Sequence, residues 1–232
     1  MIYQKLKKSS PNSGSVIALK RCSQESMVYC HRGVEMPTLP LNINLQGKIA
    51  VVAGGGSVAL RKVRSLLSSG AVIRLTAPEV CREIRALSDA GELSVRIGRY
   101  LSADLENAFL VIAATNDAAV NQEVAADAIE RRILVAVADN PTSGNCTFPA
   151  ILRRGNLEIA VSTGGRCPTL ASEIRDIIAD VIGEEYGAAL QQLAAEREKL
   201  LTDGNGNTYN TQVLRSLARR LIVELTDRKD TV

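Results

Sequence analysis

The stretch Lys48-Ile-Ala-Val-Val-Ala-Gly-Gly-Gly-Ser-Val-Ala-Leu-Arg-Lys62 decides the fold. An apolar, strand-favouring run at 49–53 leads into three consecutive glycines, and a helix-favouring segment follows at once. In such a turn the first glycine allows a tight bend and the second lets a phosphate approach the backbone. The helix N-terminus adds free N–H groups and a partial positive charge. This order of features predicts a site for a dinucleotide pyrophosphate.

The spacing of the turn is Gly54-x-Gly56-x-x-Ala59. Alanine suits the third position, because that residue only has to let the helix pack closely on the strand. Three glycines alone also occur in ordinary loops, and the flanking strand and helix favour the dinucleotide interpretation. Ser57 is equally compatible with an N-cap role. The cofactor-binding candidates of this turn are Gly54, Gly55, Gly56, Ser57 and Val58.

Strand and helix signals alternate along the next 85 or so residues. Such alternation predicts an α/β fold of the Rossmann type, with a doubly wound parallel sheet whose ligands bind beyond the carboxyl ends of the strands. The loops at 54–57, 115–117 and 139–145 should therefore face the ligand. We expect strands at 49–53, 72–76, 93–97, 109–114 and 133–138, and helices at 57–69, 78–89 and 118–131.

The pattern changes after residue 146. Two strands are expected around Gly155-Asn156, at 147–153 and 157–162, and a second glycine-rich loop comes next at 163–168. A helix with an apolar stripe is expected from 169 to about 184. Two further helices are expected at 186–202 and 211–226, joined by a loop at 203–207, and their apolar stripes are typical of core packing.

Composition excludes several classes of function. The net charge of +3 arises in residues 1–35, which hold six Lys or Arg against two Glu, so the rest of the chain offers no basic nucleic-acid surface. The only histidine is His31, which excludes a Ser-His-Asp site and a His-ligated metal in the folded part. The five cysteines form no C-x-x-C pair, so we expect no metal cluster and a reducing, cytoplasmic setting. No run is long and apolar enough for a membrane span.

Residues 1–35 are rich in Ser, Lys and Gly and lack sustained periodicity, which predicts a flexible N-terminal extension. Met36 directly precedes the first ordered-looking sequence. Met36 as the true start and a genuine tail are both open at this point.

Polar residues that come after the predicted strands are the remaining candidates. Glu79 lies 23 residues after Gly56, near the place where an acid usually meets the ribose, although it can also be a first-turn acid of a helix. Thr115 and Asn116 end the fourth strand and either line the cofactor or cap the next helix. Asp139 ends the fifth strand and is the natural general base, with an Asp-Asn-Pro turn as the alternative.

Together these residues resemble one family. Its markers are Leu39-Pro-Leu, Gly54 to Lys62, Ala113-Ala-Thr-Asn-Asp117 with Val120-Asn121, Val137-Ala-Asp139, Phe148-Pro-Ala150, Arg154-Gly155, Val161-Ser-Thr-Gly-Gly165 and Pro168-Thr-Leu-Ala171. In this order and spacing they resemble the precorrin-2 dehydrogenase / sirohydrochlorin ferrochelatase family, the N-terminal module of siroheme synthase. The resemblance runs from about Leu39 to the end of the chain.

The resemblance implies a homodimeric enzyme that oxidises precorrin-2 to sirohydrochlorin with NAD and, in many members, inserts Fe²⁺ to give siroheme. It implies an NAD-binding Rossmann domain, here 36–148, a small α+β dimerisation segment, 149–184, and a C-terminal helical domain, 185–232. Cofactor contacts at Pro78 and Glu79 and a role for Asp139 in both reactions are implied by the same matches.

The resemblance further implies that the loop Thr163, Gly164, Gly165 and Arg166 faces the tetrapyrrole, whose eight carboxylates suit N–H groups and a guanidinium. This chain departs from the family at Cys167, where relatives usually have Ser. The absence of an arginine run near Glu79 favours NAD over NADP. A dehydrogenase without chelatase activity and an NAD-sensing regulatory module are the alternatives. A short-chain dehydrogenase is disfavoured, because Tyr100 and Tyr186 lack a lysine four residues later.

Overall fold

The computed structural model describes residues 38–202 and 208–229. All of the described residues belong to one compact unit, 36–232. The predicted extension at 1–35 and the predicted loop at 203–207 lie outside the described residues.

A five-stranded parallel sheet forms the first part of the unit 36–232, as expected. Its strands are β1 (Ile49–Ala53), β2 (Val72–Ala77), β3 (Ser94–Ile97), β4 (Leu110–Ala113) and β5 (Leu134–Val137), in the order β3-β2-β1-β4-β5. The chain moves outward in one direction from β1 to β3 and in the other from β4 to β5. The switch point therefore lies between β1 and β4, where open sheets of this type bind their ligands. The predicted doubly wound fold is confirmed.

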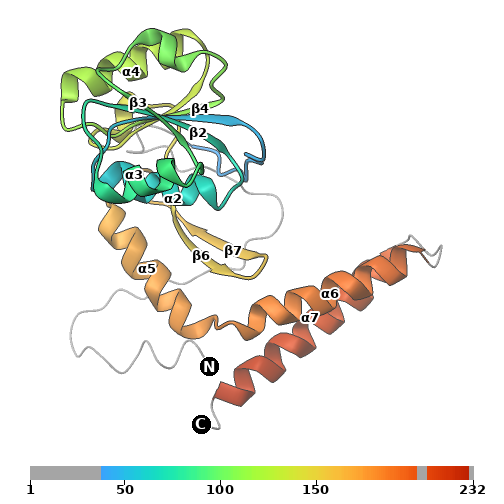
Figure 1. Ribbon diagram of the computed structural model, residues 1–232. Helices are drawn as coiled ribbons and strands as arrows, with labels where there is room; N and C mark the ends of the chain where they lie inside the picture. The colour runs from blue at the N-terminus through green and yellow to red at the C-terminus, as the bar shows by residue number, and fades with distance from the viewer. Residues whose placement is uncertain (1–37, 203–207, 230–232) are drawn as a thin grey trace, which may run out of the picture. The chain divides into compact units, whose positions relative to one another are not determined.

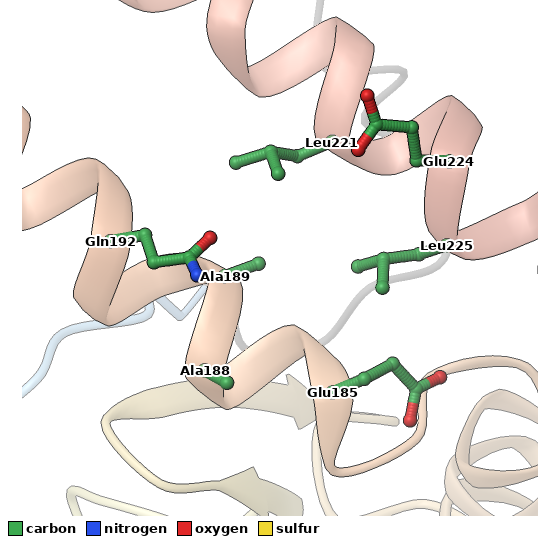
Figure 2. Close-up of a pocket in the computed structure, with 7 residues that line it drawn as sticks. All are labelled: Glu185, Ala188, Ala189, Gln192, Leu221, Glu224 and Leu225. Carbon is green, nitrogen blue, oxygen red and sulfur yellow. The ribbon is translucent and has the colours of Figure 1, made fainter.

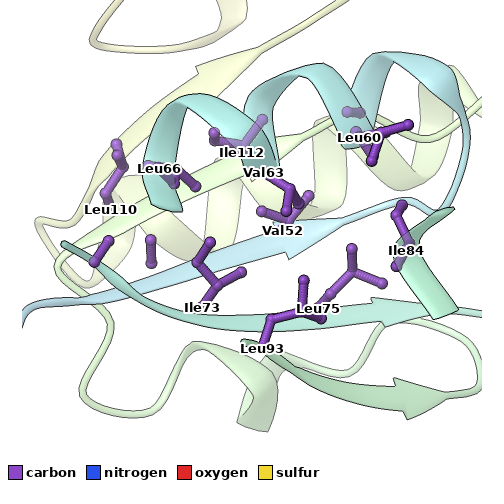
Figure 3. Close-up of a cluster of buried hydrophobic side chains, with 14 of the residues drawn as sticks. Val52, Leu60, Val63, Leu66, Ile73, Leu75, Ile84, Leu93, Leu110 and Ile112 are labelled. Atoms are coloured by element: carbon purple, nitrogen blue, oxygen red, sulfur yellow. The ribbon is translucent and has the colours of Figure 1, made fainter. Parts of the chain in front are cut away.

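Helices cover both faces of the sheet. Helices α2 (Ser57–Leu67) and α3 (Arg82–Asp89) lie on one face and α4 (Ala118–Glu130) on the other (Figure 1). Figure 3 shows the core under α2, where Val63 and Leu66 meet strand residues such as Val52 and Ile73. A second apolar cluster fills the face under α4. These two clusters hold the strand ends, and thus the loops that extend from them, in fixed positions.

Helix α3 starts four residues later than the sequence predicts, at Arg82 instead of Pro78. The reason is a hydrogen bond between the loop after β2 and the glycine turn, in which the Cys81 N–H donates to the Gly55 carbonyl at 2.8 Å. This bond keeps the segment before Arg82 out of the helix and ties it to the glycine turn. The first-turn acid of α3 is Glu83, so the interpretation of Glu79 as a helix-stabilising acid is wrong.

The remaining elements also appear in the predicted order. Strands β6 (Ala150–Arg154) and β7 (Leu157–Val161) form an antiparallel pair, and α5 (Pro168–Val181), α6 (Glu185–Thr202) and α7 (Thr208–Lys229) come after it. Helices α6 and α7 pack side by side (Figure 1). Their stripe residues Leu190, Leu193, Leu214, Leu217 and Leu221 are only half-buried. The expectation of core packing for these stripes is corrected, because the two helices cover mainly each other.

The glycine turn is held by an unusually close backbone contact. Gly54 has φ +126°, and a Cβ there would lie 2.3 Å from the carbonyl oxygen of Ala114. Its N–H donates to the Thr76 carbonyl at 2.9 Å. Only glycine fits a position with this φ and this contact. Gly54 therefore lets the end of β1 approach the loop after β4.

Gly54→Ala should lower the free energy of unfolding by about 2–4 kcal/mol, because the methyl group would collide with backbone rather than with a movable side chain. Gly56→Ala is the matched control, since nothing lies within 4 Å of a Cβ at Gly56. We expect that variant to unfold within about 1 kcal/mol of the wild type. Urea unfolding followed by circular dichroism measures both, and equal stability of the two variants would contradict the packing described for Gly54.

Candidate dinucleotide and substrate site

The glycine turn lies between the ends of β2 and β4. A Cβ on Gly55 would lie 2.0 Å from the Glu79 carbonyl oxygen, so Gly55 is required for packing, as Gly54 is. Gly56 is different, because the space beside it is open. Gly56 is also the N-cap of α2, so Ser57 is the first helical residue and its predicted N-cap alternative is wrong.

The N-terminus of α2 is prepared for an anion. The first helical hydrogen bond runs from the Leu60 N–H to the Gly56 carbonyl, so the amides of residues 57–59 are not used by the helix. Gly56 offers no side-chain cap, and the first turn of α2 contains no acidic residue. Val58 is exposed at this end. Free amides, open space at Gly56 and the helix dipole together fit a pyrophosphate.

Pro78 and Glu79 lie in the loop after β2, directly beside the turn. Both are exposed, and the Glu79 backbone is in van der Waals reach of Gly55. The Glu79 side chain is therefore free to meet a ligand that occupies the turn. This position suits an acid that accepts hydrogen bonds from ribose hydroxyls.

The loop after β4 contains Thr115 and Asn116, but neither caps the helix that comes next. The N-cap of α4 is Asp117, whose carboxylate accepts from the Ala119 N–H at 2.9 Å. Thr115 Oγ1 accepts from the Asp117 N–H at 3.2 Å and so stiffens the loop. Asn116 is exposed. The cap alternative is thus wrong for both residues, and both stay next to the crevice.

A buried amide, Asn121, connects this loop to Asp139. Asn121 is 1% exposed, and its Oδ1 accepts from the Thr115 N–H at 3.0 Å and from Thr115 Oγ1 at 2.8 Å. Its Nδ2 donates to the Thr115 carbonyl at 3.2 Å and to Asp139 Oδ1 at 3.0 Å. Turning the amide over would set its oxygen against two acceptors, so these four contacts fix its orientation.

Asn121 was not among the site residues predicted from the sequence, although a signal was present. It shares a helical face with Val124, Ala125 and Ala128, all of which are buried. A lone amide on an apolar helix face has to find hydrogen-bond partners inside the protein. Asn121 finds them at the ends of β4 and β5.

Asp139 is exposed at the carboxyl end of β5. Its carboxylate contacts Asn121, and the hydrogen bonds described for it do not include one to its own turn, which argues against the purely structural Asp-Asn-Pro alternative. The loop beyond it is anchored by Asn145. The Asn145 side chain accepts from the Val135 N–H at 2.7 Å and donates to the Ile133 carbonyl at 3.0 Å, in place of a sixth strand.

The second glycine-rich loop lies against the loop that begins at Asp139. A Cβ on Gly165 would lie 2.7 Å from Pro141 Cβ. Within the loop, the Arg166 N–H donates to the Thr163 carbonyl and the Cys167 N–H to Thr163 Oγ1, both at 3.2 Å. Gly164 and Arg166 are exposed. The loop at 139–145 and the loop expected to face the tetrapyrrole are therefore neighbours.

A cavity of about 120 Å³ lies where these parts meet. Its walls come from α2, from the ends of β4 and β5, from residues 146–148 and from the second loop; they include Val58, Lys62, Ala138, Pro141, Gly165 and Pro168. A larger cavity of about 300 Å³ lies between α6 and α7 and contains two carboxylates, Glu185 and Glu224 (Figure 2). No residue of the glycine turn or of the two loops lines the larger cavity, whereas Val58, Pro141 and Gly165 line the smaller one, which therefore adjoins the candidate site.

Within residues 38–202 and 208–229, no group of three or more His, Cys, Asp or Glu side chains is placed to hold a metal ion. None of the helices in the same ranges combines the length and the apolar character that crossing a bilayer requires. The described site offers free backbone amides and an exposed carboxylate.

Comparisons with known proteins agree with this geometry. Residues 41–150 match a family model for NAD(P)-binding domains, and residues 154–180 match the central domain of sirohaem biosynthesis proteins. A siroheme synthase of Pseudomonas entomophila is 43% identical over 165 residues, which are 71% of this chain and 36% of that protein. One from Pseudomonas fluorescens is 45% identical over 152 residues, 66% of this chain and 33% of that protein. The chain thus spans about a third of the length of these relatives.

A solved structure extends the similarity to a whole protein. The precorrin-2 dehydrogenase SirC is 30% identical, with a TM-score of 0.62, and the match covers 79% of this chain and 98% of SirC. Because nearly all of SirC is covered, the similarity is not restricted to the dinucleotide domain. The chain belongs to the precorrin-2 dehydrogenase family.

Proposed function

We propose that this chain oxidises precorrin-2 to sirohydrochlorin with NAD. The observation that carries the proposal is the Asp139 carboxylate, exposed at the mouth of the dinucleotide crevice and held there by buried Asn121. The likeness to SirC, which is named a precorrin-2 dehydrogenase, supports the choice of substrate. A regulatory module that only senses NAD would have no use for an oriented carboxylate beside a second ligand loop.

In this proposal NAD, when bound, accepts a hydride from the macrocycle, and the chain's residues do the rest. The amides at the start of α2 bind the pyrophosphate, while Glu79 accepts from the ribose and Thr115 and Asn116 line the crevice. The macrocycle must also lose a proton, which Asp139 takes as general base. Thr163, Gly164, Gly165 and Arg166 bind the substrate's carboxylates. The Glu79 carboxylate would repel a 2′-phosphate, which favours NAD over NADP.

Insertion of Fe²⁺ into sirohydrochlorin is the second part of the proposal. Iron is a substrate here, and pyrrole protons have to leave as it binds. The exposed Asp139 carboxylate is the group of the described site that can accept them. We also propose that the reactions take place in the cytoplasm, because the described cysteines, Cys81, Cys146 and Cys167, are all free thiols.

Asp139→Asn should lower the dehydrogenase rate by about 10²–10⁴-fold, because an amide cannot act as the base. NADH formation from precorrin-2 and NAD measures this rate, and sirohydrochlorin with Fe²⁺ and no NAD measures insertion. We expect the NAD dissociation constant to be unchanged, since Asp139 lies at the substrate side. Full dehydrogenase activity in this variant would refute the assignment, and loss of one activity alone would show that the other uses a different group.

Asn121→Asp tests whether Asn121 positions Asp139. Two carboxylates that face each other at 3.0 Å resist being ionised together, so the acidic limb of the pH–rate profile should move up by about one to three units. Gln122→Glu, exposed on the next position of α4, adds the same charge without that contact and should leave the profile unchanged. A purely structural role for Asn121 predicts loss of stability with no movement of the limb.

We further propose that the chain forms a homodimer through α5, within a dimerisation segment at 149–184 that separates the dinucleotide domain from a helical domain at 185–232. One side of α5 exposes Leu170, Ile174, Ile177 and Val181, spaced as in a helix–helix seam. An apolar row of this length is costly to leave in water.

Ile177→Asp should convert the dimer to a monomer, because Ile177 is the most exposed residue of this row at 65% and an unpaired carboxylate would be buried at the seam. Sedimentation equilibrium measures the change. Glu173→Asp, on the same helix, is the control and should remain dimeric. A wild-type monomer, or an unchanged dimer in the Ile177 variant, would contradict this interface.

A further inference from the structure

Two adjacent cations, Arg61 and Lys62, line the cavity of about 120 Å³. They lie on α2, beyond the turn that meets the pyrophosphate. The same cavity is also lined by Pro141, two residues after Asp139, and by Gly165 and Pro168 of the second loop. The cations thus face the space where the proposed substrate loops meet.

Lys62 is half-buried without an acidic partner in the described part of the chain. Its ammonium lies 4.2 Å from the centroid of the Phe148 ring, and no ion pair within 4.0 Å joins it to a described carboxylate. Burial and, after it, the like charge of Arg61 lower the pKa of Lys62. A ring face compensates a buried charge only partly.

The size of the cavity limits what can fill it. Whole-ligand pockets usually measure roughly 300–1,000 Å³, so this one cannot hold a macrocycle. It has room for the end of one substituent of a ligand. The positive charges of Arg61 and Lys62 favour an anionic substituent. If the proposed function holds, the substrate carries carboxylates on short flexible arms around its rim.

We propose that Lys62, with Arg61 beside it, binds one peripheral carboxylate of the tetrapyrrole and so fixes the rotation of the macrocycle over the nicotinamide. The substrate carboxylate would be the negative partner of Lys62, which forms no ion pair with a described carboxylate. This inference rests on the proposed function and adds a substrate contact outside the two glycine-rich loops. A phosphate of NAD is the other anion that reaches α2, so the test has to separate the two.

The test compares Lys62→Met with wild-type protein. Methionine keeps the apolar stem and removes the charge. We expect the KM for precorrin-2 and the dissociation constant for sirohydrochlorin, followed by fluorescence, to rise by about tenfold or more, because a charge-assisted hydrogen bond is lost. The dissociation constant for NAD should stay within about twofold. Lys62→Arg keeps the charge and should restore most of the affinity.

Lys48→Met is the matched control. Lys48 also lies over an aromatic ring, 5.8 Å from the Phe109 centroid. It directly precedes β1, at the amino ends of the strands, whereas the candidate site lies at their carboxyl ends. We expect this variant to bind both ligands as the wild type does.

Three results would overturn the inference. Unchanged tetrapyrrole affinity in Lys62→Met would show that Lys62 only packs on Phe148, and weakened NAD binding would assign the cation to the cofactor. If Lys62→Met does not fold, wild-type tetrapyrrole affinity in Lys62→Gln gives the same negative answer. Failure of the wild-type protein to bind or oxidise any tetrapyrrole would instead refute the proposed function.

Discussion

The close approach of Gly54 to the backbone of Ala114 is the constraint on which the site depends. It brings the end of β1 against the loop after β4 at the point where the strand order reverses. The Gly55 carbonyl of the same turn accepts a hydrogen bond from the Cys81 N–H, which follows β2. The carboxyl ends of β2, β1 and β4 are therefore held together. Gly54 and Gly55 allow the backbone to pass close to Ala114 and Glu79, where a side chain would collide. The turn can then continue into the open space at Gly56 and the free amides of α2.

A second, polar constraint positions the Asp139 carboxylate. Asn121 uses all its hydrogen-bonding capacity to join the loop after β4 to Asp139 after β5. A carboxylate at a strand end is common, but one oriented by a buried amide is restricted to a narrow range of positions. In the proposed reaction the glycine turn sets where the cofactor lies, and Asn121 sets the position of Asp139 relative to it.

The sequence predicts the sheet well because buried parallel strands are continuous apolar runs, as at Val51 and Val52, with glycine or polar residues at their ends. It misplaces the start of α3, because the bond from Cys81 to Gly55 joins segments distant in sequence. Asn121 was not identified as a site residue, because its partners depend on how α4 packs. The pairing of α6 with α7 was missed as well, since an apolar stripe does not say which surface covers it.

The central claim is that the glycine turn and Asp139 serve one reaction, in which a hydride passes directly from the tetrapyrrole to the dinucleotide. A single turnover with precorrin-2 deuterated at the carbons that lose hydrogen tests it most directly. The account predicts deuterium in the nicotinamide ring of the NADH formed, detected by mass spectrometry. Oxidation of precorrin-2 without deuterium in NADH would contradict the account, because the hydride would then have left by another route.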